Sequence, residues 1–397
     1  MAKEIDLNSL YSYNYIMILN YKYRLYPNKK QAQKLQEQFF VSTQSWNYAL
    51  NLRIKNLKHK KGFTPLKLIE KYIKTKLKVR NLPFHSGVLQ MSVRNLDNTL
   101  KTYFKNKEDF SFPRFKKSHF IQQSFEFKNQ GIQIKENHFH ILKMKIKWKY
   151  HRELPSKPKK IIIKRETDGN YYVIFSVKKE NEQFKKTGEN VGIDLNVKNV
   201  AFSTNLNRSY LKVIQKLEKY DKKYFKIQKK LSQRYHKKSR SKNTKKLQKK
   251  QNKIHKKVKN IKEDFFHQTS LKMIKDFDRI TIEKLDIKKM IEGDIRHLRK
   301  SISEVSWDSL VSKIKYKAEM HNKILIQINP AYTSQRCHNC GHIDRKNRKI
   351  QSVFHCISCN HKENADINAA RNILDYDTWS LEQKTRWDAR HPTKSLA

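Results

Sequence analysis

The chain has 397 residues, and its 88 Lys and Arg residues against 36 Asp and Glu residues give a formal net charge of +52. Apolar residues make up 37% and aromatic residues 11% of the chain, which is enough to fill folded cores and argues against disorder throughout. So large a positive charge is typical of proteins that bind a polyanion, above all nucleic acid, although AT-rich coding sequence also enriches lysine. The length predicts two or three domains.

Membrane insertion and export are both disfavoured by the distribution of apolar residues. No apolar run approaches the roughly 18 residues that a spanning helix needs. The N-terminus lacks a basic start followed by a long apolar run and a cleavage site. A membrane-surface role would need a basic amphipathic helix with aromatic residues on its apolar side, and no such helix is apparent. We therefore expect a cytoplasmic, nucleoid-associated protein of a prokaryote.

The first hundred residues predict one strand followed by three helices. Residues 1–20 are polar and are expected to be poorly ordered, and residues 21–28 are expected to supply the first strand of a barrel, ended by Pro27 and Asn28. Apolar side chains then recur three or four residues apart, the spacing of a helix. We expect a helical lobe over residues 29–109, with helices at 29–57, 66–79 and 88–104.

Between residues 110 and 177 the hydrophobic period changes from helical to alternating. The alternating segments are short, and Asp168-Gly169-Asn170 provides a hairpin turn before the last of them. Short strands at this spacing suggest a small barrel. The polar stretch 178–189 that follows is the clearest domain boundary. The expected strands are 133–136, 138–142, 144–148, 160–164 and 171–177.

The remainder of the chain reads as an α/β domain with a basic insertion. The order is strand, hairpin partner, helices, strand, helix, strand and helix, which is compatible with a central mixed sheet. Segment 211–262 carries 22 Lys and Arg residues against 2 acidic residues and keeps helical apolar spacing on both sides of a turn at 237–244. It predicts two long basic helices that bind nucleic acid or, alternatively, a hairpin with a merely solvated face. The other expected elements are strands 190–195, 200–203, 279–283 and 323–328, and helices 307–321 and 366–374.

The most specific motif is a pair of Cys-x-x-Cys sequences, Cys337-His-Asn-Cys340 and Cys356-Ile-Ser-Cys359, which contain all four cysteines. Without an export signal, clustered cysteines favour metal binding over disulfides. Each pair flanks a tight turn, so that four thiolates can converge tetrahedrally on zinc. Because protein ligands would fill every position, this zinc is expected to be structural. Free thiols or a redox pair are the alternatives.

Three carboxylates stand at the ends of predicted elements. Asp194 and Glu283 each follow an apolar strand, and Asp366 opens a helix. Acidic residues in such places are costly unless they bind cations or pair with them, and converging carboxylates are what two-metal phosphodiester hydrolysis requires. By spacing alone the signal for such a triad is weak, and the favoured interpretation is that Glu283 and Asp366 are ordinary charges at a strand end and a helix start. Asp264, Asp286 and Glu304 are neighbouring candidates.

A pair of histidines, His138 and His140, has the His-hydrophobe-His form of nickases that use a tyrosine nucleophile. Alternation along a strand would place both rings on one face, where they could hold a metal. Two solvent-facing histidines on a barrel strand is the interpretation that we favour.

Six further motifs occur in order along the chain: Tyr23-Arg-Leu-Tyr-Pro-Asn28, Phe112-Pro-Arg-Phe-Lys116, Val191-Gly-Ile-Asp-Leu195, Ile282-Glu-Lys-Leu285, Tyr332-Thr-Ser-Gln335 and Ala365-Asp-Ile-Asn-Ala-Ala370. Together they resemble the TnpB family, the transposon-encoded RNA-guided DNA endonucleases related to type V CRISPR effectors. The resemblance runs from about Tyr21 to Leu374. Asn196 stands where the family usually has Gly, a change that a turn tolerates because Asn adopts left-handed backbone more readily than most residues.

The resemblance implies an RNase H-like (RuvC-like) nuclease whose catalytic carboxylates are Asp194, Glu283 and Asp366, holding two Mg²⁺ ions. It also implies an oligonucleotide-binding-like wedge barrel, a helical recognition lobe and a guide RNA derived from the transposon end. All three acidic positions are filled, which argues against the nuclease-dead relatives. The implied divisions are the lobe at 29–109, the barrel at 21–28 and 110–187, the nuclease at 188–335 and 362–378, the zinc module at 336–361 and a tail at 379–397.

These observations predict a metal-dependent DNA endonuclease that cuts double-stranded DNA beside a short flanking motif. Guide pairing would choose the sequence, while the protein would hold the heteroduplex by its backbone. Lys245, Lys246, Lys249 and Lys250 are the expected nucleic-acid contacts on the basic helices. A transposase that joins strands with the same carboxylates is one alternative, and a DNA-binding regulator that carries a guide RNA without cutting is another.

Overall fold

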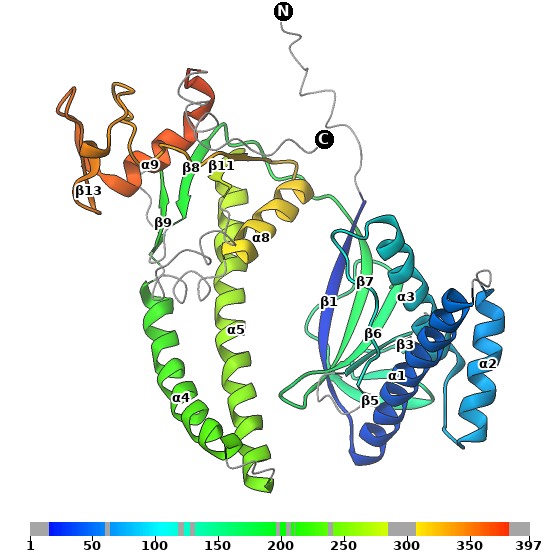
Figure 1. The fold of residues 1–397 in the computed structure, drawn as a ribbon. Helices are drawn as coiled ribbons and strands as arrows, with labels where there is room; N and C mark the ends of the chain where they lie inside the picture. The colour runs from blue at the N-terminus through cyan, green and yellow to red at the C-terminus, as the bar shows by residue number, and fades with distance from the viewer. Residues whose placement is uncertain are drawn as a thin grey trace, which may run out of the picture. The chain divides into compact units, whose positions relative to one another are not determined.

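The computed structural model describes residues 16–59, 64–117, 123–127, 132–195, 199–203, 208–209, 211–236, 241–284 and 307–380 (Figure 1). They belong to two compact units. The N-terminal unit contains Ile16–Glu180 together with Lys245–Lys253, and the C-terminal unit contains Asn181–Thr244 and the chain from Ile254.

A curled antiparallel sheet of seven strands forms the N-terminal unit's framework, in the order β2-β6-β7-β1-β5-β4-β3. Its inner face is apolar because alternate residues along each strand point inward, among them Tyr23, Phe139, Ile146 and Phe175. The strands are β1 (Ile16–Tyr26), β2 (Gln123–Phe127), β3 (Gln133–Ile134), β4 (His138–Ile141), β5 (Met144–Lys149), β6 (Lys160–Arg165) and β7 (Tyr171–Glu180).

Two features of this sheet correct the sequence-based expectation. Residues 16–20, expected to be poorly ordered, form the first half of β1, because β7 continues far enough to pair with them from Ile16 opposite Glu180 onward. Residues 1–15 lie outside the described residues. Strand β2 was not expected at all, yet its two buried phenylalanines, Phe125 and Phe127, face Ile163 and Ile161 of β6.

Three amphipathic helices complete the N-terminal unit: α1 (Lys29–Lys58), α2 (Leu66–Val79) and α3 (Ser86–Lys105). Helix α1 begins with a capping box in which Asn28 and Gln31 each bond the other's backbone N–H. A buried ion pair, Arg53 to Asp97 at 3.0 Å, links α1 to α3. Helix positions thus match the apolar spacing of the sequence.

The C-terminal unit is built on a five-stranded mixed sheet in the order β10-β9-β8-β11-β12. Strands β8, β11 and β12 are parallel, and β9 pairs with β8 in the antiparallel sense as the expected hairpin partner. The apolar core contains Val191, Ile193, Ile280 and Ile282 from the strands. The strands are β8 (Asn190–Leu195), β9 (Asn199–Phe202), β10 (Arg208–Ser209), β11 (Arg279–Glu283) and β12 (Ile324–Ile328).

Helix α9 (Ala365–Leu374) packs on β8 (Figure 1). The two elements approach so closely that a Cβ on Gly192 of β8 would lie 2.0 Å from the carbonyl oxygen of Ala370 and 2.5 Å from the amide nitrogen of Leu374. Only glycine fits between them, because both clashing atoms belong to backbone. The Val-Gly-Ile-Asp sequence therefore sets the helix against the strand that carries Asp194.

The basic segment forms two long helices, α4 (Leu211–His236) and α5 (Lys242–Asp276), as expected. They run side by side (Figure 1), and the rings of Tyr224 and His255 lie 6.5 Å apart between them. The second helix begins within the expected turn at 237–244, because the Ser241 side chain accepts from the Thr244 backbone N–H and caps it there.

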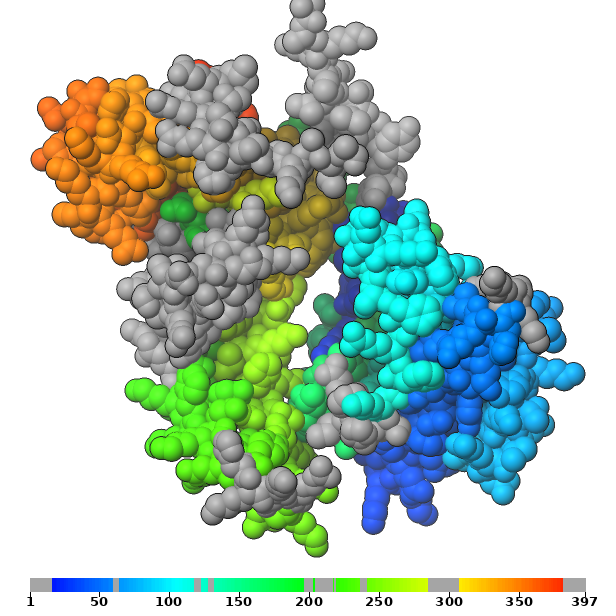
Figure 2. Space-filling model, viewed as in Figure 1, coloured from blue at the N-terminus to red at the C-terminus, as the bar shows by residue number. Residues whose placement is uncertain are grey.

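The cysteine-containing segment forms a small module of the C-terminal unit, seen in orange in Figure 2. Helix α8 (Trp307–Met320) precedes β12 and the module, which includes η1 (Arg345–Arg348) and the antiparallel pair β13 (Val353–His355) and β14 (Lys362–Asn364). After α9 and η2 (Tyr376–Thr378), Trp379 is only 3% exposed, and Arg336 lies over its ring. The expected tail therefore contributes a buried residue.

In the part of the chain that the structure describes, none of the helices has the length and apolar character needed to span a membrane.

Candidate active site and metal centre

Two of the three sequence-predicted carboxylates lie side by side on neighbouring strands. Strands β8 and β11 are parallel with Ile193 opposite Ile282, so the next residue of each strand, Asp194 and Glu283, stands at the same level and on the same face. Strand β11 ends at Glu283, and β8 ends one residue after Asp194, at Leu195. Two acidic groups thus meet at the carboxyl edge of the sheet.

The pKa of Glu283 reflects the closeness of the two carboxylates. Burial and the charge of Asp194 together raise the pKa of Glu283 to about 8, against smaller lowering effects from the Thr333 hydroxyl and the Arg348 charge. The Thr333 hydroxyl donates a hydrogen bond to Glu283 Oε1. A buried carboxylate beside a second carboxylate is costly unless a cation joins them. The position therefore favours a bound cation.

Asp366 is brought to the same edge by the start of α9. Asn364 caps this helix by accepting from the backbone N–H groups of Asp366 at 3.0 Å and Ile367 at 3.2 Å. The Asp366 carboxylate accepts from the guanidinium of Arg348 at 3.3 Å. Because the same guanidinium acts electrostatically on Glu283, Arg348 connects Asp366 to the strand-borne pair.

The three carboxylates lie near one another, but in this structure their oxygen atoms are not close enough together to form a group that could hold one metal ion. Within the described residues, the one such group of His, Cys, Asp or Glu side chains is the cysteine cluster. The donor chemistry of the carboxylates, which are hard oxygen ligands, nevertheless fits Mg²⁺.

Several positioning residues were not identified from the sequence. Asn368 and Asn372, one turn apart on α9, are fully buried and hydrogen bond to the backbone of the segment that leads into the cysteine module. Thr333 lies in the quoted Tyr332-Thr-Ser-Gln335 motif, but its role depends on a partner 50 positions away. Arg348 carried no sequence signal, since lysine and arginine are common throughout the chain.

The rival acidic residues are only partly described. Asp286 and Glu304 lie outside the described residues. Asp264 lies on α5, where its carboxylate accepts from Gln268 at 3.1 Å. His138 and His140 alternate with buried Phe139 on β4, so both lie on the outer face of the sheet, but each is half-buried and the Nε2 atom of His140 is shielded from solvent.

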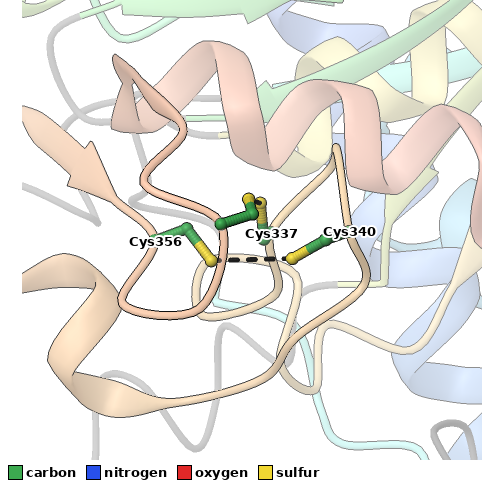
Figure 3. A group of neighbouring side chains, drawn as sticks. Cys337, Cys340 and Cys356 are labelled. Atoms are coloured by element: carbon green, nitrogen blue, oxygen red, sulfur yellow. Dashed lines mark hydrogen bonds between the residues drawn. The ribbon is translucent and has the colours of Figure 1, made fainter.

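The four cysteine sulfurs converge as the motif predicted. All four lie within 4.8 Å of one another, with Cys337 Sγ 3.7 Å from Cys359 Sγ and Cys340 Sγ 3.6 Å from Cys356 Sγ. Figure 3 shows the side chains of Cys337, Cys340 and Cys356 directed toward one another from two loops. A tetrahedral ion with bonds of about 2.3 Å separates its sulfurs by about 3.8 Å, whereas a disulfide needs about 2.05 Å. The spacing fits zinc.

Both Cys-x-x-Cys turns have the same backbone pattern. The N–H groups of Cys337 and Cys356 donate to the carbonyls of His342 and His361, each five residues ahead. Gly341 and Asn360, which close the two turns, have φ of 76° and 58° and so need residues that tolerate the left-handed region. Burial raises the pKa of Cys337 to about 12, so metal binding must release its proton.

The four lysines expected to contact nucleic acid, Lys245, Lys246, Lys249 and Lys250, are all exposed on α5. Exposure leaves them accessible to phosphate groups but also fits a solvated face.

Comparison with known proteins identifies three matching family models. Residues 174–293 match "Probable transposase", residues 307–373 match "Cas12f1-like, TNB domain" and residues 17–62 match "Helix-turn-helix domain". In this chain the last of these regions forms strand β1 and the single long helix α1 over its described residues.

Curated relatives and solved structures extend the comparison. The chain is 28% identical over 306 residues to InsQ of Escherichia coli (strain K12), named as an RNA-guided DNA endonuclease, covering 73% of this chain and 74% of InsQ. It is 55% identical over 64 residues to the CRISPR-associated endodeoxyribonuclease Cas12f1 of Sulfoacidibacillus thermotolerans, covering 16% and 15% of the two chains. The structure of a Cas12f1-sgRNA-target DNA complex matches with a TM-score of 0.56 at 15% identity, covering 87% of this chain and 83% of that one, which shows a shared fold.

Proposed function

Because the chain belongs to the TnpB family, we propose that it is an RNA-guided DNA endonuclease that hydrolyses phosphodiester bonds at Asp194, Glu283 and Asp366. The observation that carries the proposal is the meeting of Asp194 and Glu283 at the ends of adjacent parallel strands, with Asp366 opening the helix that covers the first strand. The relatives' names, read with this geometry, support the same activity.

The carboxylates would hold two Mg²⁺ ions, which when bound supply an activated water and stabilise the leaving oxygen. Asp194 and Glu283 present oxygen donors from the strand ends, and Asp366 presents one from the helix. Gly192 lets the helix pack closely on the strand, and the buried asparagines of α9 hold the helix to the backbone of Thr333 and Arg336, so the donors stay aligned. Arg348 adds positive charge beside the place that the scissile phosphate would occupy.

We further infer the roles of the chain's parts. The five-stranded sheet and α9 correspond to a RuvC-like, RNase H-fold nuclease at residues 188–335 and 362–378, with the zinc module 336–361 inserted. The curled sheet corresponds to an oligonucleotide-binding-like wedge, and residues 29–109 to a helical recognition lobe. The order of elements supports these assignments, since the strands of each sheet come from the ranges named.

The outer face of the curled sheet supports an RNA partner. By strand register, three rows of outward side chains lie next to one another, and they include five Lys or Arg residues, two His and no carboxylate. The pKa of His138 is lowered, first by partial burial and then by the charges of Lys145, His140 and Lys147. Nearby Glu166 is paired with Lys22. The rows are Lys164, Tyr172, Arg24 and Lys149; Tyr26, Lys147 and His138; and Lys145, His140 and Gln133.

Such a face attracts a phosphate backbone without reading sequence. We propose that it holds a guide RNA derived from the transposon end, while the double-stranded DNA target also contacts the lysines of α5. Sequence choice would then come from pairing between the guide and the target strand. Binding to nucleic acid would place the protein at the nucleoid.

The alternatives are a transposase and a DNA-binding regulator. The "Probable transposase" description of the matching family model favours the transposase. A transposase would use the same carboxylates to join DNA strands, because both reactions use metal-activated oxygen nucleophiles. A regulator would carry the guide RNA and bind DNA without cutting it.

One experiment separates the three functions. RNA that copurifies with the protein is sequenced, and the complex is then incubated with Mg²⁺ and duplexes that carry the matching target beside randomised flanking sequence. The proposal expects guide-dependent hydrolysed ends beside one short flanking motif. Joined strands would establish the transposase, and guide-dependent binding without cutting under any flanking sequence would establish the regulator.

A further inference from the structure

The loop between α3 and β2 carries the Phe112-Pro-Arg-Phe-Lys116 motif, to which the proposed site assigns no role. Its backbone is clamped to α1 from two directions. The Asn47 side chain donates to the carbonyl of Lys116 at 2.9 Å and accepts from its N–H at 2.8 Å. The Trp46 indole N–H donates to the carbonyl of Arg114 at 3.1 Å. These three bonds hold Phe115 from both sides.

Side chains on the inner side of the loop reinforce the clamp. Pro113 is buried, and the Phe112 ring meets Tyr103 edge-on with centroids 5.3 Å apart. The Lys116 ammonium lies 3.6 Å from the centroid of the Trp46 ring, a cation–π contact. The backbone on either side of Phe115 therefore has little freedom to move.

The same clamp leaves one aromatic ring in solvent. Phe115 is 54% exposed, and its neighbours Arg114 and Lys117 are exposed cations. A scattered exposed apolar residue is ordinary. Here, however, the backbone is fixed on both sides of a ring that stands between positive charges, an arrangement that suits stacking on a base whose phosphates the cations attract.

We propose that Phe115 stacks on an unpaired base of the target DNA while Arg114 and Lys117 contact the adjoining phosphates. This inference rests on the proposed function, in which the target duplex must open before the guide can pair with it. Opening the first base pair loses one stacking step, and one aromatic ring restores a comparable stabilisation. A single fixed aromatic ring can therefore replace the stacking that the opened base loses.

The guide RNA is a less suitable occupant of the loop. Holding a folded RNA calls for an extended basic surface, which the outer face of the curled sheet already offers. A protein partner is disfavoured by the surrounding cations, because protein interfaces exclude charge from their cores. The proposed ligand of the loop is therefore DNA with at least one unpaired base.

The test uses the full chain loaded with its RNA, in an Asp194→Ala background that preserves the DNA. The target carries 2-aminopurine next to the flanking motif, and its fluorescence reports stacking of the opened base. We expect Phe115→Ala to weaken DNA binding roughly 5- to 150-fold, to abolish the change in fluorescence and to leave guide-RNA affinity unchanged. Phe115→Trp should retain both signals.

Two further variants make the result specific. Phe104→Ala removes another exposed phenylalanine, 42% exposed on α3, and should leave DNA binding unchanged. Asn47→Ala frees the loop while keeping the ring, and should weaken DNA binding in the same direction as Phe115→Ala.

The outcomes separate this inference from the function on which it rests. If the RNA-loaded chain with Phe115 intact does not bind the target, the proposed function fails and takes the inference with it. If the chain with Phe115 binds the target, and the Phe115→Ala variant has the same DNA affinity and the same fluorescence, only the inference about Phe115 is overturned. If Phe115→Ala weakens binding of the guide RNA, the loop is an RNA contact, and the inference is overturned as well.

Discussion

The guanidinium of Arg348 donates to the carboxylate of Asp366 at 3.3 Å, and this contact joins the cysteine module to the helix that opens the candidate active site. Arg348 also bonds the carbonyl of Gln351 through its Nε and Nη2 atoms, at 3.2 and 2.8 Å, so the module's own turn holds it in place. Arg348 is thus one of the side chains through which the cysteine module contacts the candidate active site.

Arg348→Gln removes this charge, and we expect DNA cleavage to fall by roughly 100- to 1000-fold, the range seen when a group that stabilises developing negative charge is lost. Binding of guide RNA and target should persist. Arg345→Gln, an exposed arginine of the same 3₁₀ turn, is the matched control and should cut normally. Wild-type cleavage by Arg348→Gln would show that the contact with Asp366 is only structural.

Asp194→Ala, Glu283→Gln and Asp366→Ala should each reduce cutting by roughly a thousandfold or more, because the remaining donors cannot fix both ions in line with the phosphate. Guide RNA and target should still bind, since binding rests on separate basic surfaces. Asp286→Ala and Glu304→Ala serve as active controls. Cleavage should require Mg²⁺ or Mn²⁺ and fail in Ca²⁺, whose geometry is looser. Full cleavage by Asp194→Ala would refute the assigned site.

The cysteine cluster should hold one tightly bound zinc per chain. Cys337→Ser or Cys356→Ser should release it and loosen residues 336–361, because the free energy of metal binding is also folding free energy for so small a module. Elemental analysis measures the zinc, and limited proteolysis measures the loosening. Purified protein without zinc would contradict the prediction.

Neutralising Lys245, Lys246, Lys249 and Lys250 to Gln should make nucleic-acid affinity less dependent on salt. Each duplex phosphate contact contributes about 0.9 to the slope of log K against log salt, so losing four contacts lowers its magnitude by about 3 to 4. The sequence that is cut should not change. An unchanged slope would mean that α5 presents only a solvated face.

The ionised carboxylate of Asp278 makes the stability of the C-terminal unit sensitive to acid. Despite some burial, the pKa of Asp278 is lowered to about 2, because its carboxylate accepts from Lys323 and from the backbone N–H groups of Gly188 and Thr187. A carboxyl whose pKa is lower in the folded state stabilises the fold above its ordinary pKa of 3.8, and this stabilisation is lost as pH falls toward 2.

Asp278→Asn should therefore lower the urea midpoint of the chain at pH 7 and make that midpoint less sensitive to pH between about 4 and 2. Asp276→Asn, two residues earlier and half-buried like Asp278, is the control. An Asp278→Asn midpoint that tracks pH as steeply as the parent chain would contradict the assignment.

The sequence by itself determined those features whose causes are local. The helices α1, α2, α3 and α9 follow from apolar spacing, and Asn28, His85 and Asn364 cap the starts of α1, α3 and α9. The cysteine cluster follows from two turns that each place a pair of thiols together. The three acidic positions could be named only from the motifs that resemble the TnpB family, because their spacing alone does not distinguish them from ordinary charges at strand ends and helix starts.

Only the tertiary structure decided which distant groups meet. Residues 16–20 become a strand because they pair with β7, which lies more than 150 positions later in the chain. Thr333 reaches Glu283 across 50 positions, and Arg348 reaches Asp366 from a separate module. The Trp379 ring likewise packs against Arg336, which lies in an earlier segment of the chain. Local propensity cannot predict such contacts, because each side chain's environment is created by chain segments that only folding brings together.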